Sequence, residues 1–406
     1  MLINIKVTKL KNLSRVTRFN QMFIVMLFWV SAHVFANEAD NTKLTVEELR
    51  IDRAFKTIPN VVGRLSNRIS LFKKEINNAD NYAALHHMVL HHGQAVWHDA
   101  KAFFIKLNNY DDRTLYWSRL QMSKALRSSS AFSTLRLSQQ QKLLWTLELV
   151  SRGQMDVKFD KKTDKKILIT GFDPFFLDRN IDQSNPSGVV ALSLDNIVLT
   201  IDGKTAEVEV LIVPVRFADF DQGMIEELLT PYIMDKGVDM VITVSMGRKD
   251  FDLERYPALR RSSKAPDNLN VFTGADSNNP LVPKLNTANL DGPEFVEFSL
   301  PVSAMQKGIG KYKVNDNRNV RTLSSKKIFA AQSLMNIVNK TSVSGSGGGY
   351  LSNEISYRSL LLRNQYNPLL PVGHIHTPRI KAFDQQALKN IVAQIKNIIT
   401  QGVTQL

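Results

Sequence analysis

Residues 166–175 read Lys-Ile-Leu-Ile-Thr-Gly-Phe-Asp-Pro-Phe. The apolar run 166–172 predicts a buried strand, and the turn residues Gly, Asp and Pro predict where it ends. The following segments alternate in the same way, with strands expected at 208–215 and 238–245 and helices at 187–196 and 218–234. Strands that alternate with helices at this spacing favour an α/β fold: a doubly wound, mostly parallel sheet with helices on both faces.

The rest of the chain is interpreted outward from this domain, which we expect to cover 165–406. Asn, Pro, Gly and Ser dominate near 269–290, which predicts a polar insertion, and 326–338 is expected to be a helix. A lysine-rich segment, 153–164, is expected to be a linker. Before it, 37–152 is predicted to be a mainly α-helical N-terminal region of unknown role, on apolar three- and four-residue spacing over 44–55, 61–76, 83–107 and 135–150.

The first 36 residues are typical of a secretory signal peptide. Five basic residues precede an apolar run, 22–32, that is too short to span a bilayer, and Val34-Phe35-Ala36 is a small-residue cleavage pattern. Cleavage after Ala36 would make the protein secreted or periplasmic, with no stable membrane span; an uncleaved anchor is the alternative. The net charge of +14 falls to +9 without these five residues, and no nucleic-acid motif accompanies it.

Five of the eight histidines lie between His86 and His98, and His87 and His91 are spaced to share a helix face. Such a pair can chelate Zn²⁺ or Ni²⁺. The glutamate of a zinc-peptidase motif is missing, however, so we expect no metal and interpret this as a helix face packed on the second domain. The chain has no cysteine, hence neither disulfides nor a thiol nucleophile.

A glycine-rich stretch, Gly347-Gly-Gly-Tyr-Leu-Ser-Asn353, is followed 24 positions after its serine by His376, in Gly373-His-Ile-His-Thr-Pro378. Glycines allow backbone amides to approach a ligand closely, and the amides at a helix N-terminus can stabilise an oxyanion. The pattern therefore offers a nucleophile, Ser352, and a possible base, His376. A helix-capping serine and an ordinary histidine are the alternative interpretation.

Five short motifs in one order resemble the pyroglutamyl peptidase I family, also called pyrrolidone-carboxylate peptidases, which are cysteine peptidases. The resemblance covers about 165–400 and rests on 170–175 with Asn185-Pro-Ser187, on Leu253-Glu-Arg255 with Pro266-Asp-Asn268, on Asp291-Gly-Pro293 with Leu300-Pro301, on 348–353 and on 373–378.

By this resemblance the family's Glu–Cys–His constellation falls on Glu254, Ser352 and His376, with serine in place of the catalytic cysteine. His376 would be the general base and Glu254 would orient it. The resemblance also implies a substrate pocket formed by Phe172, Phe175, Asn185, Lys264, Gly348 and Gly349. Phe176-Leu177 stand where the family has two glycines, which would narrow or reshape that pocket, and Glu354 stands where the family often has histidine.

We therefore expect a secreted or periplasmic hydrolase that removes N-terminal pyroglutamate, or a related amide group, from peptides without a cofactor. Two alternatives stay open. One is an inactive family member that acts as a binding or scaffold protein, with Phe176 and Leu177 filling the pocket. The other is a serine hydrolase acting on another envelope amide or ester. The resemblance also makes a homo-oligomer one expected state, unless the N-terminal region covers the surfaces involved.

Overall fold

The structure, a computed structural model, describes residues 40–406 except 109, 236 and 326. Within it, Asn41–Leu406 form one compact unit. The predicted signal peptide, 1–36, lies outside the described residues. In the part of the chain that is described, no helix is both long and apolar enough to cross a bilayer.

The N-terminal region is helical, as predicted. Its most central helix is α6, Arg113–Arg127, which packs against seven other helices of the region. Thirteen of the 15 residues of α6 are buried, although several of these are arginine, serine or glutamine. The surrounding helices are α1 (Val46–Leu49), α2 (Ile51–Thr57), α3 (Pro59–Val62), α4 (Ser66–Ile76), α5 (Tyr82–Leu107), α7 (Ser130–Ser133) and α8 (Leu137–Val150).

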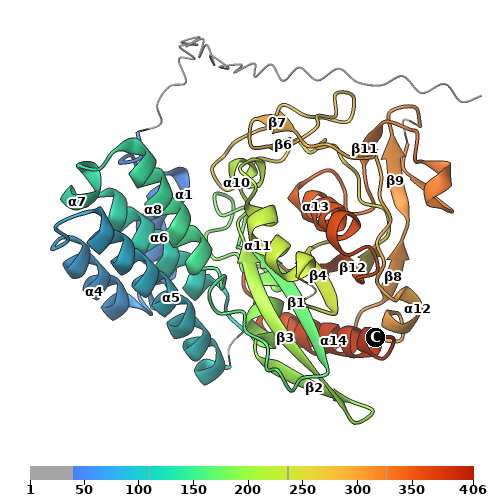
Figure 1. Cartoon of the computed structure of the whole chain (residues 1–406), viewed down its shortest axis with the longest axis horizontal. Helices are drawn as coiled ribbons and strands as arrows, with labels where there is room; N and C mark the ends of the chain where they lie inside the picture. Colours follow the sequence, from blue (N-terminus) through green and yellow to red (C-terminus); the bar gives the residue numbers. More distant parts are fainter. Residues whose placement is uncertain (1–39, 109, 236, 326) are drawn as a thin grey trace, which may run out of the picture. The chain divides into compact units, whose positions relative to one another are not determined.

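The sequence prediction of a mostly parallel α/β sheet is confirmed. Seven strands lie in the order β2-β3-β1-β4-β12-β5-β8 (Figure 1). Four of the six neighbouring pairs are parallel, and the β2–β3 and β5–β12 pairs are antiparallel. The strands are β1 (Lys165–Phe172), β2 (Ile197–Ile201), β3 (Lys204–Val213), β4 (Met240–Met246), β5 (Phe251–Glu254), β8 (Val314–Asn317) and β12 (Val372–Thr377).

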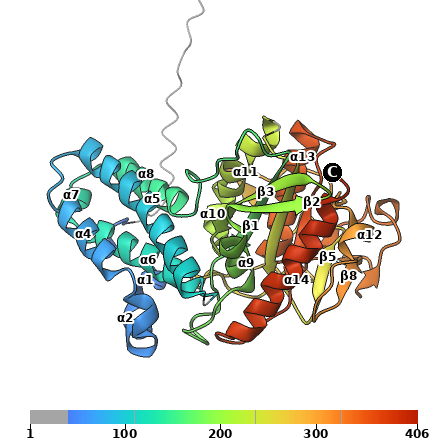
Figure 2. The same ribbon diagram turned by 90° about the horizontal axis from the view of Figure 1, so that it is seen from below.

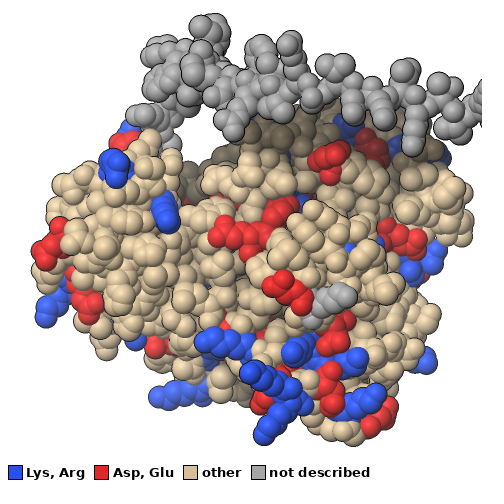
Figure 3. Space-filling model, viewed as in Figure 1, with Lys and Arg blue, Asp and Glu red and all other residues tan. Residues whose placement is uncertain are grey.

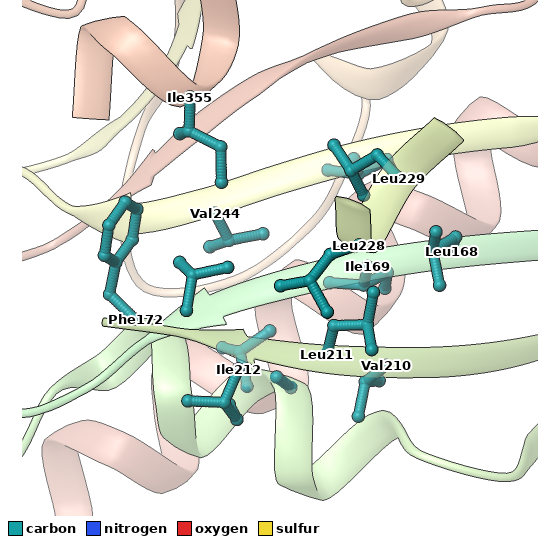
Figure 4. Close-up of a cluster of buried hydrophobic side chains, with 14 of the residues drawn as sticks. Leu168, Ile169, Phe172, Val210, Leu211, Ile212, Leu228, Leu229, Val244 and Ile355 are labelled. Atoms are coloured by element: carbon teal, nitrogen blue, oxygen red, sulfur yellow. The ribbon is translucent and has the colours of Figure 1, made fainter. Parts of the chain in front are cut away.

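Helices cover both faces of this sheet (Figure 2). On one face lie α9 (Pro186–Leu194) and α14 (Gln385–Val403); on the other lie α10 (Phe217–Asp221), α11 (Met224–Met234) and α13 (Leu351–Tyr366). Figure 4 shows side chains of β1, β3 and β4 meeting those of α11 and α13 in a buried cluster. Such burial on both faces explains why the strands are continuous apolar runs rather than alternating ones.

The segment between β5 and α13 contains small elements. These are β6 (Lys284–Leu285), β7 (Ala288–Asn289), α12 (Val302–Met305), β9 (Asn319–Thr322), β10 (Phe329–Ala330), a 3-10 turn (Leu334–Asn336) and β11 (Ser342–Ser344). The helix predicted over 326–338 is therefore wrong. Phe329 pairs with Val320 of β9, and Ser333 has an extended backbone that interrupts any helix. The apolar spacing of this segment serves a separate small core that includes Val320 and Ile337.

The N-terminal helices and the sheet share one hydrophobic cluster. It includes Phe72, Trp97 and Leu147 from the helices as well as Ile169 and Val210 from the sheet. The predicted linker, 153–164, contributes Val157 and Phe159, which pack against this same cluster. Hydrophobic burial thus ties the helical region directly to the sheet.

One buried carboxyl group joins the two regions and makes a pH-dependent prediction. Burial raises the pKa of Asp112 to about 7, although its hydrogen bonds from Ser184 and from the Asn185 amide favour the charged form. The pKa of an aspartate in an unfolded chain is about 3.9. Between these two pKa values the folded state keeps a proton on Asp112 that the unfolded state has already released. The free energy of unfolding should therefore fall as pH rises from about 4 to 7.

We expect Asp112→Asn, which resembles the protonated form, to weaken this decline by up to about 1.4 kcal/mol per pH unit. Urea unfolding of both proteins across this pH range measures it. Asp52→Asn is the matched control, because Asp52 lies in the same region with its side chain 79% exposed. Parallel stability curves for the wild type and Asp112→Asn would contradict the prediction.

Candidate active site

A buried glutamate–histidine pair lies at the centre of the candidate site. Nδ1 of His376, on β12, is hydrogen-bonded to a carboxylate oxygen of Glu254, the last residue of β5. Glu254 is fully buried and His376 is 6% exposed. Burial raises the pKa of Glu254, and the neighbouring imidazole of His376 opposes this increase. The contact orients the imidazole and leaves its Nε2 available to accept or donate a proton.

Two further residues fix this pair. Asn317 of β8 donates to the second oxygen of Glu254 at 2.8 Å and to the carbonyl of Ser346 at 3.0 Å. Gly247, after β4, lies against the histidine: a Cβ placed there would be 2.5 Å from the Cβ of His376. The imidazole is therefore confined on its glycine side, and the carboxylate is held from the adjacent strand.

Ser352 is the second residue of α13, where Tyr350 is the N-cap. Its hydroxyl donates to the carbonyl of Gly347 at 3.2 Å, so it does not cap the helix. The backbone amides of Leu351, Ser352 and Asn353 have no acceptor among the described residues. Because these donors lie at the positive end of the helix dipole, they can stabilise a developing negative charge.

Glycine is required at positions 348 and 349, before Ser352, for two different structural reasons. Gly348 has a φ of +93°, a conformation that strongly favours glycine. Gly349 allows a close approach instead: a Cβ there would lie 2.1 Å from the hydroxyl of Ser262, whose amide donates to the Gly349 carbonyl. Both residues shape the turn that delivers the helix N-terminus.

A small cavity of about 40 Å³ opens beside Ser352. It takes residues from the ends of β1 and β4 and from the start of α13, together with α9's N-cap, Asn185. The lining is mainly apolar and aromatic: Phe172, Phe175, Asn185, Val215, Ser245, Met246, Tyr350, Leu351 and Ser352. Phe172 is buried and stacks on Phe220, whereas Phe175 is half-buried beside Phe176.

Of the other predicted pocket residues, Asn185 lines the cavity, whereas Lys264, Gly348 and Gly349 do not. Asn185 lines the cavity, but its side chain is bonded to the Asp173 carbonyl and to Ser187, as a cap of α9. Lys264 does not line the cavity; its side chain is 79% exposed and lies 3.6 Å from Asp276.

Phe176 and Leu177 do not occupy the cavity. Leu177 is buried in a cluster with Tyr116 and Trp117 of α6. Phe176 has a φ of +63°, so it keeps a backbone conformation in which glycine is favoured. The alternative in which both side chains fill the pocket is therefore wrong, because neither lines the cavity and Leu177 is buried in the helical region instead.

Three contributors to the site were missed in the sequence. Asn317 lies outside every motif, and nothing local marks it. Asn353 belongs to a motif but was given no role; its carboxamide bonds both the amide and the carbonyl of Ala258, tying α13 to the chain after β5. Gly247 belongs to none of the motifs quoted above. Their partners are distant in sequence, which explains the omission.

Four further histidines lie in surroundings of their own. His374 is buried between the hydroxyls of Thr243 and Ser245, and burial holds the pKa of its imidazole well below its usual value. His92 is buried and bonded to Glu75 at 2.7 Å. His87 and His91 are exposed, so the predicted packing of this helix face is wrong for them. Among the described residues, no three His, Cys, Asp or Glu side chains are placed to hold a metal ion.

The surface charge is mixed rather than uniformly basic. On the face shown in Figure 3, acidic side chains lie among the lysines and arginines. Several arginines are neutralised internally, including Arg255 by Asp316 and Arg260 by Glu294.

Comparison with known proteins identifies relatives for both regions. The family model described as the PA0049 C-terminal domain matches residues 166–303 and 311–381, about half of the chain, and the PA0049 N-terminal domain matches 31–148. The uncharacterized protein PA0049 of Pseudomonas aeruginosa is 28% identical, over 66% of this chain and 63% of its own length. The chain thus spans slightly less than two thirds of that relative.

Among solved structures, similar ones are pyrrolidone carboxyl peptidases. A mutant of the Pyrococcus furiosus enzyme is 23% identical and covers 59% of this chain and 99% of its own, with a TM-score of 0.41. The Thermococcus litoralis enzyme is 21% identical over 59% and 94%, with a TM-score of 0.40. Pyroglutamyl peptidase I of Bacillus amyloliquefaciens is 21% identical over 59% and 98%, with a TM-score of 0.40.

Proposed function

This chain belongs to the PA0049 family, and we propose that it is a serine hydrolase that removes N-terminal pyroglutamate, or a related amide group, from peptides. The observation that carries the proposal is the buried Glu254–His376 pair at the strand ends, together with Ser352 at the N-terminus of α13. Ser352 also lines a small, largely apolar cavity of a size suited to a compact acyl group.

In the proposed reaction the Ser352 hydroxyl turns from the Gly347 carbonyl towards His376 and attacks the carbonyl carbon of the acyl group. Nε2 of His376 takes the hydroxyl proton, and Glu254 stabilises the resulting imidazolium through Nδ1. The free amides of α13 bind the oxyanion. The C–N bond then breaks, and the amine leaves with the proton from His376.

The remaining ester is hydrolysed by the same groups. A water molecule gives a proton to Nε2 of His376 and attacks the ester carbon. The oxyanion collapses, Ser352 leaves and regains its proton from His376, and the free acid departs. Serine is a much weaker acid than cysteine, so this chemistry depends on the oriented base more strongly than it would with a thiol.

A direct test is hydrolysis of a pyroglutamyl-coumarin amide by the purified protein, beside the Ser352→Ala variant. We expect coumarin release from the wild type and only background from the variant. A fluorophosphonate probe should label the wild type at Ser352 and leave the variant unlabelled. Labelling without pyroglutamyl hydrolysis would point to another amide or ester as the substrate. If the wild type shows no labelling and no hydrolysis, a binding protein is favoured instead.

We further propose that the protein is exported, because of the signal-peptide pattern in the first 36 residues. Cell fractionation of the full chain tests this. The protein should be found in the periplasmic or secreted fraction, starting at Asn37, and recovery of an uncleaved chain in the cytoplasm would contradict it.

A further inference from the structure

Asp173, the acid of the motif at 171–175, is held by two arginines from outside the α/β sheet. The guanidinium of Arg119, on α6, lies 2.6 Å from its Oδ2, and that of Arg152, just after α8, lies 2.8 Å from the same atom. The side chains of both arginines are 1% exposed and that of Asp173 is 3% exposed. Asp173 directly follows Phe172 and lies two positions before Phe175, so it anchors the aromatic wall of the cavity.

The two arginines are themselves fixed by Glu148 of α8. Arg152 binds the Glu148 carboxylate at 2.7 Å and Arg119 lies 3.6 Å from it, while Arg216 binds it from the sheet side at 2.7 Å. Burial alone would raise the pKa of Glu148, but the surrounding guanidinium groups hold it well below its usual range. Removing one member would leave an uncompensated buried charge, which is strongly destabilising, so each member depends on the others.

Other contacts from the helical region reach the same wall. The Asp112 carboxylate accepts a hydrogen bond at 3.0 Å from the backbone amide of Asn185, a residue that lines the cavity. Arg50 donates to the carbonyl of Asn268, whose side chain in turn donates to the Pro174 carbonyl at 2.9 Å. Together with the burial of Leu177 against α6, these contacts hold the segment that follows β1 on several sides.

We infer that Arg119 and Arg152 are positioning residues for the candidate active site, and that the helical region forms the rear support of its acyl pocket. This inference rests on the proposed function. Neither arginine lines the cavity, so neither would touch the substrate. They act through Asp173 on Phe172 and Phe175, and their loss should weaken recognition of the acyl group more than the reactivity of residue 352.

The absence of cysteine allows a test that does not need turnover. In the full chain, Ser352→Cys supplies a single thiol. Its alkylation by iodoacetamide reports local reactivity, whereas alkylation by a pyroglutamyl chloromethyl ketone also requires the pocket. The ratio of the two second-order rate constants, ketone over iodoacetamide, measures how well the pocket recognises the acyl group.

We expect Arg119→Met or Arg152→Met, in the Ser352→Cys background, to lower this ratio about 10- to 100-fold, since small displacements near a site are costly. The iodoacetamide rate should change little. Arg68→Met is the matched control, because Arg68 pairs with Asp99 between α4 and α5 at 2.7 Å, on helices that do not supply the Asp173 contact. It should leave the ratio unchanged. Circular dichroism shows whether each variant folds. If one does not, the same ratio is measured on Asp173→Asn or Arg152→Lys instead.

The outcomes separate the two claims. A parent protein that shows no preference for the pyroglutamyl reagent would contradict the proposed function and this inference with it. A parent that prefers the reagent, with an unchanged ratio in the folded Arg119, Arg152 or Asp173 variants, would overturn the inference alone.

Discussion

Ser352→Ala is expected to lower kcat for pyroglutamyl-coumarin by about 10⁴-fold or more, and His376→Ala by a similar factor. The double variant should be no worse than either single one. This non-additivity follows from the mechanism: without its nucleophile the base has nothing to activate, and without its base the serine hydroxyl is a poor nucleophile. Additive losses would mean that the two residues act independently and would contradict the shared mechanism.

The same experiment extends to the buried carboxylate. Glu254→Gln keeps the shape of the side chain and can still accept the hydrogen bond from Asn317. It removes the negative charge that faces Nδ1 of His376. We expect a loss of about 10³- to 10⁴-fold in kcat, because the imidazole loses both its preferred tautomer and the stabilisation of its cation. The matched control is Asp316→Asn: Asp316 is a carboxylate on the same strand as Asn317 and pairs with Arg255 at 2.9 Å. That variant should retain most of the activity.

Ser352→Cys is the second large expected effect. An ordinary thiol has a pKa near about 8.5. At the N-terminus of α13, and with His376 as the proposed base, the thiol should ionise one to two pH units lower, which is about a 10- to 100-fold increase in thiolate at pH 6. The alkylation rate with iodoacetamide, followed from pH 5 to 10, measures this directly.

The control for this measurement is Ser352→Cys combined with His376→Ala. The pKa of the thiol should rise back towards its ordinary value when the imidazole is absent, with the helix N-terminus retaining a smaller effect. Identical alkylation profiles with and without His376 would show that the histidine does not reach residue 352. They would count against a catalytic dyad whatever the native substrate is.

Much of the sheet could be predicted from the sequence, because its evidence is local. The apolar runs that became β1, β3 and β4 are continuous, bounded by turn residues and alternate with helical patterns. The same holds for Ser352 and His376: a glycine turn, a helix start and a strand end are written in neighbouring residues. The family resemblance added Glu254 to them, and the structure brings Glu254 and His376 into contact.

Local patterns failed where burial did not follow hydrophobicity. Helix α6 was not predicted, and in it burial includes polar side chains such as Arg119, Gln121 and Ser123. The segment at 326–338 failed in the opposite way: its apolar spacing suits a helix, but tertiary pairing of Phe329 with β9 decides its conformation. In both cases long-range partners outweigh intrinsic preference.

The sequence by itself determined the alternation of strands and helices and pointed to Ser352 and His376, and its resemblance to a known family added Glu254 to the candidate set. Only the tertiary structure decided what holds them. Asn317 reaches Glu254 across 63 positions, and Arg119 reaches Asp173 across 54. The physical reason is that a buried charge or amide must find a partner wherever the fold supplies one. Such a partner is set by the packing of distant elements, and no pattern of neighbouring residues records it.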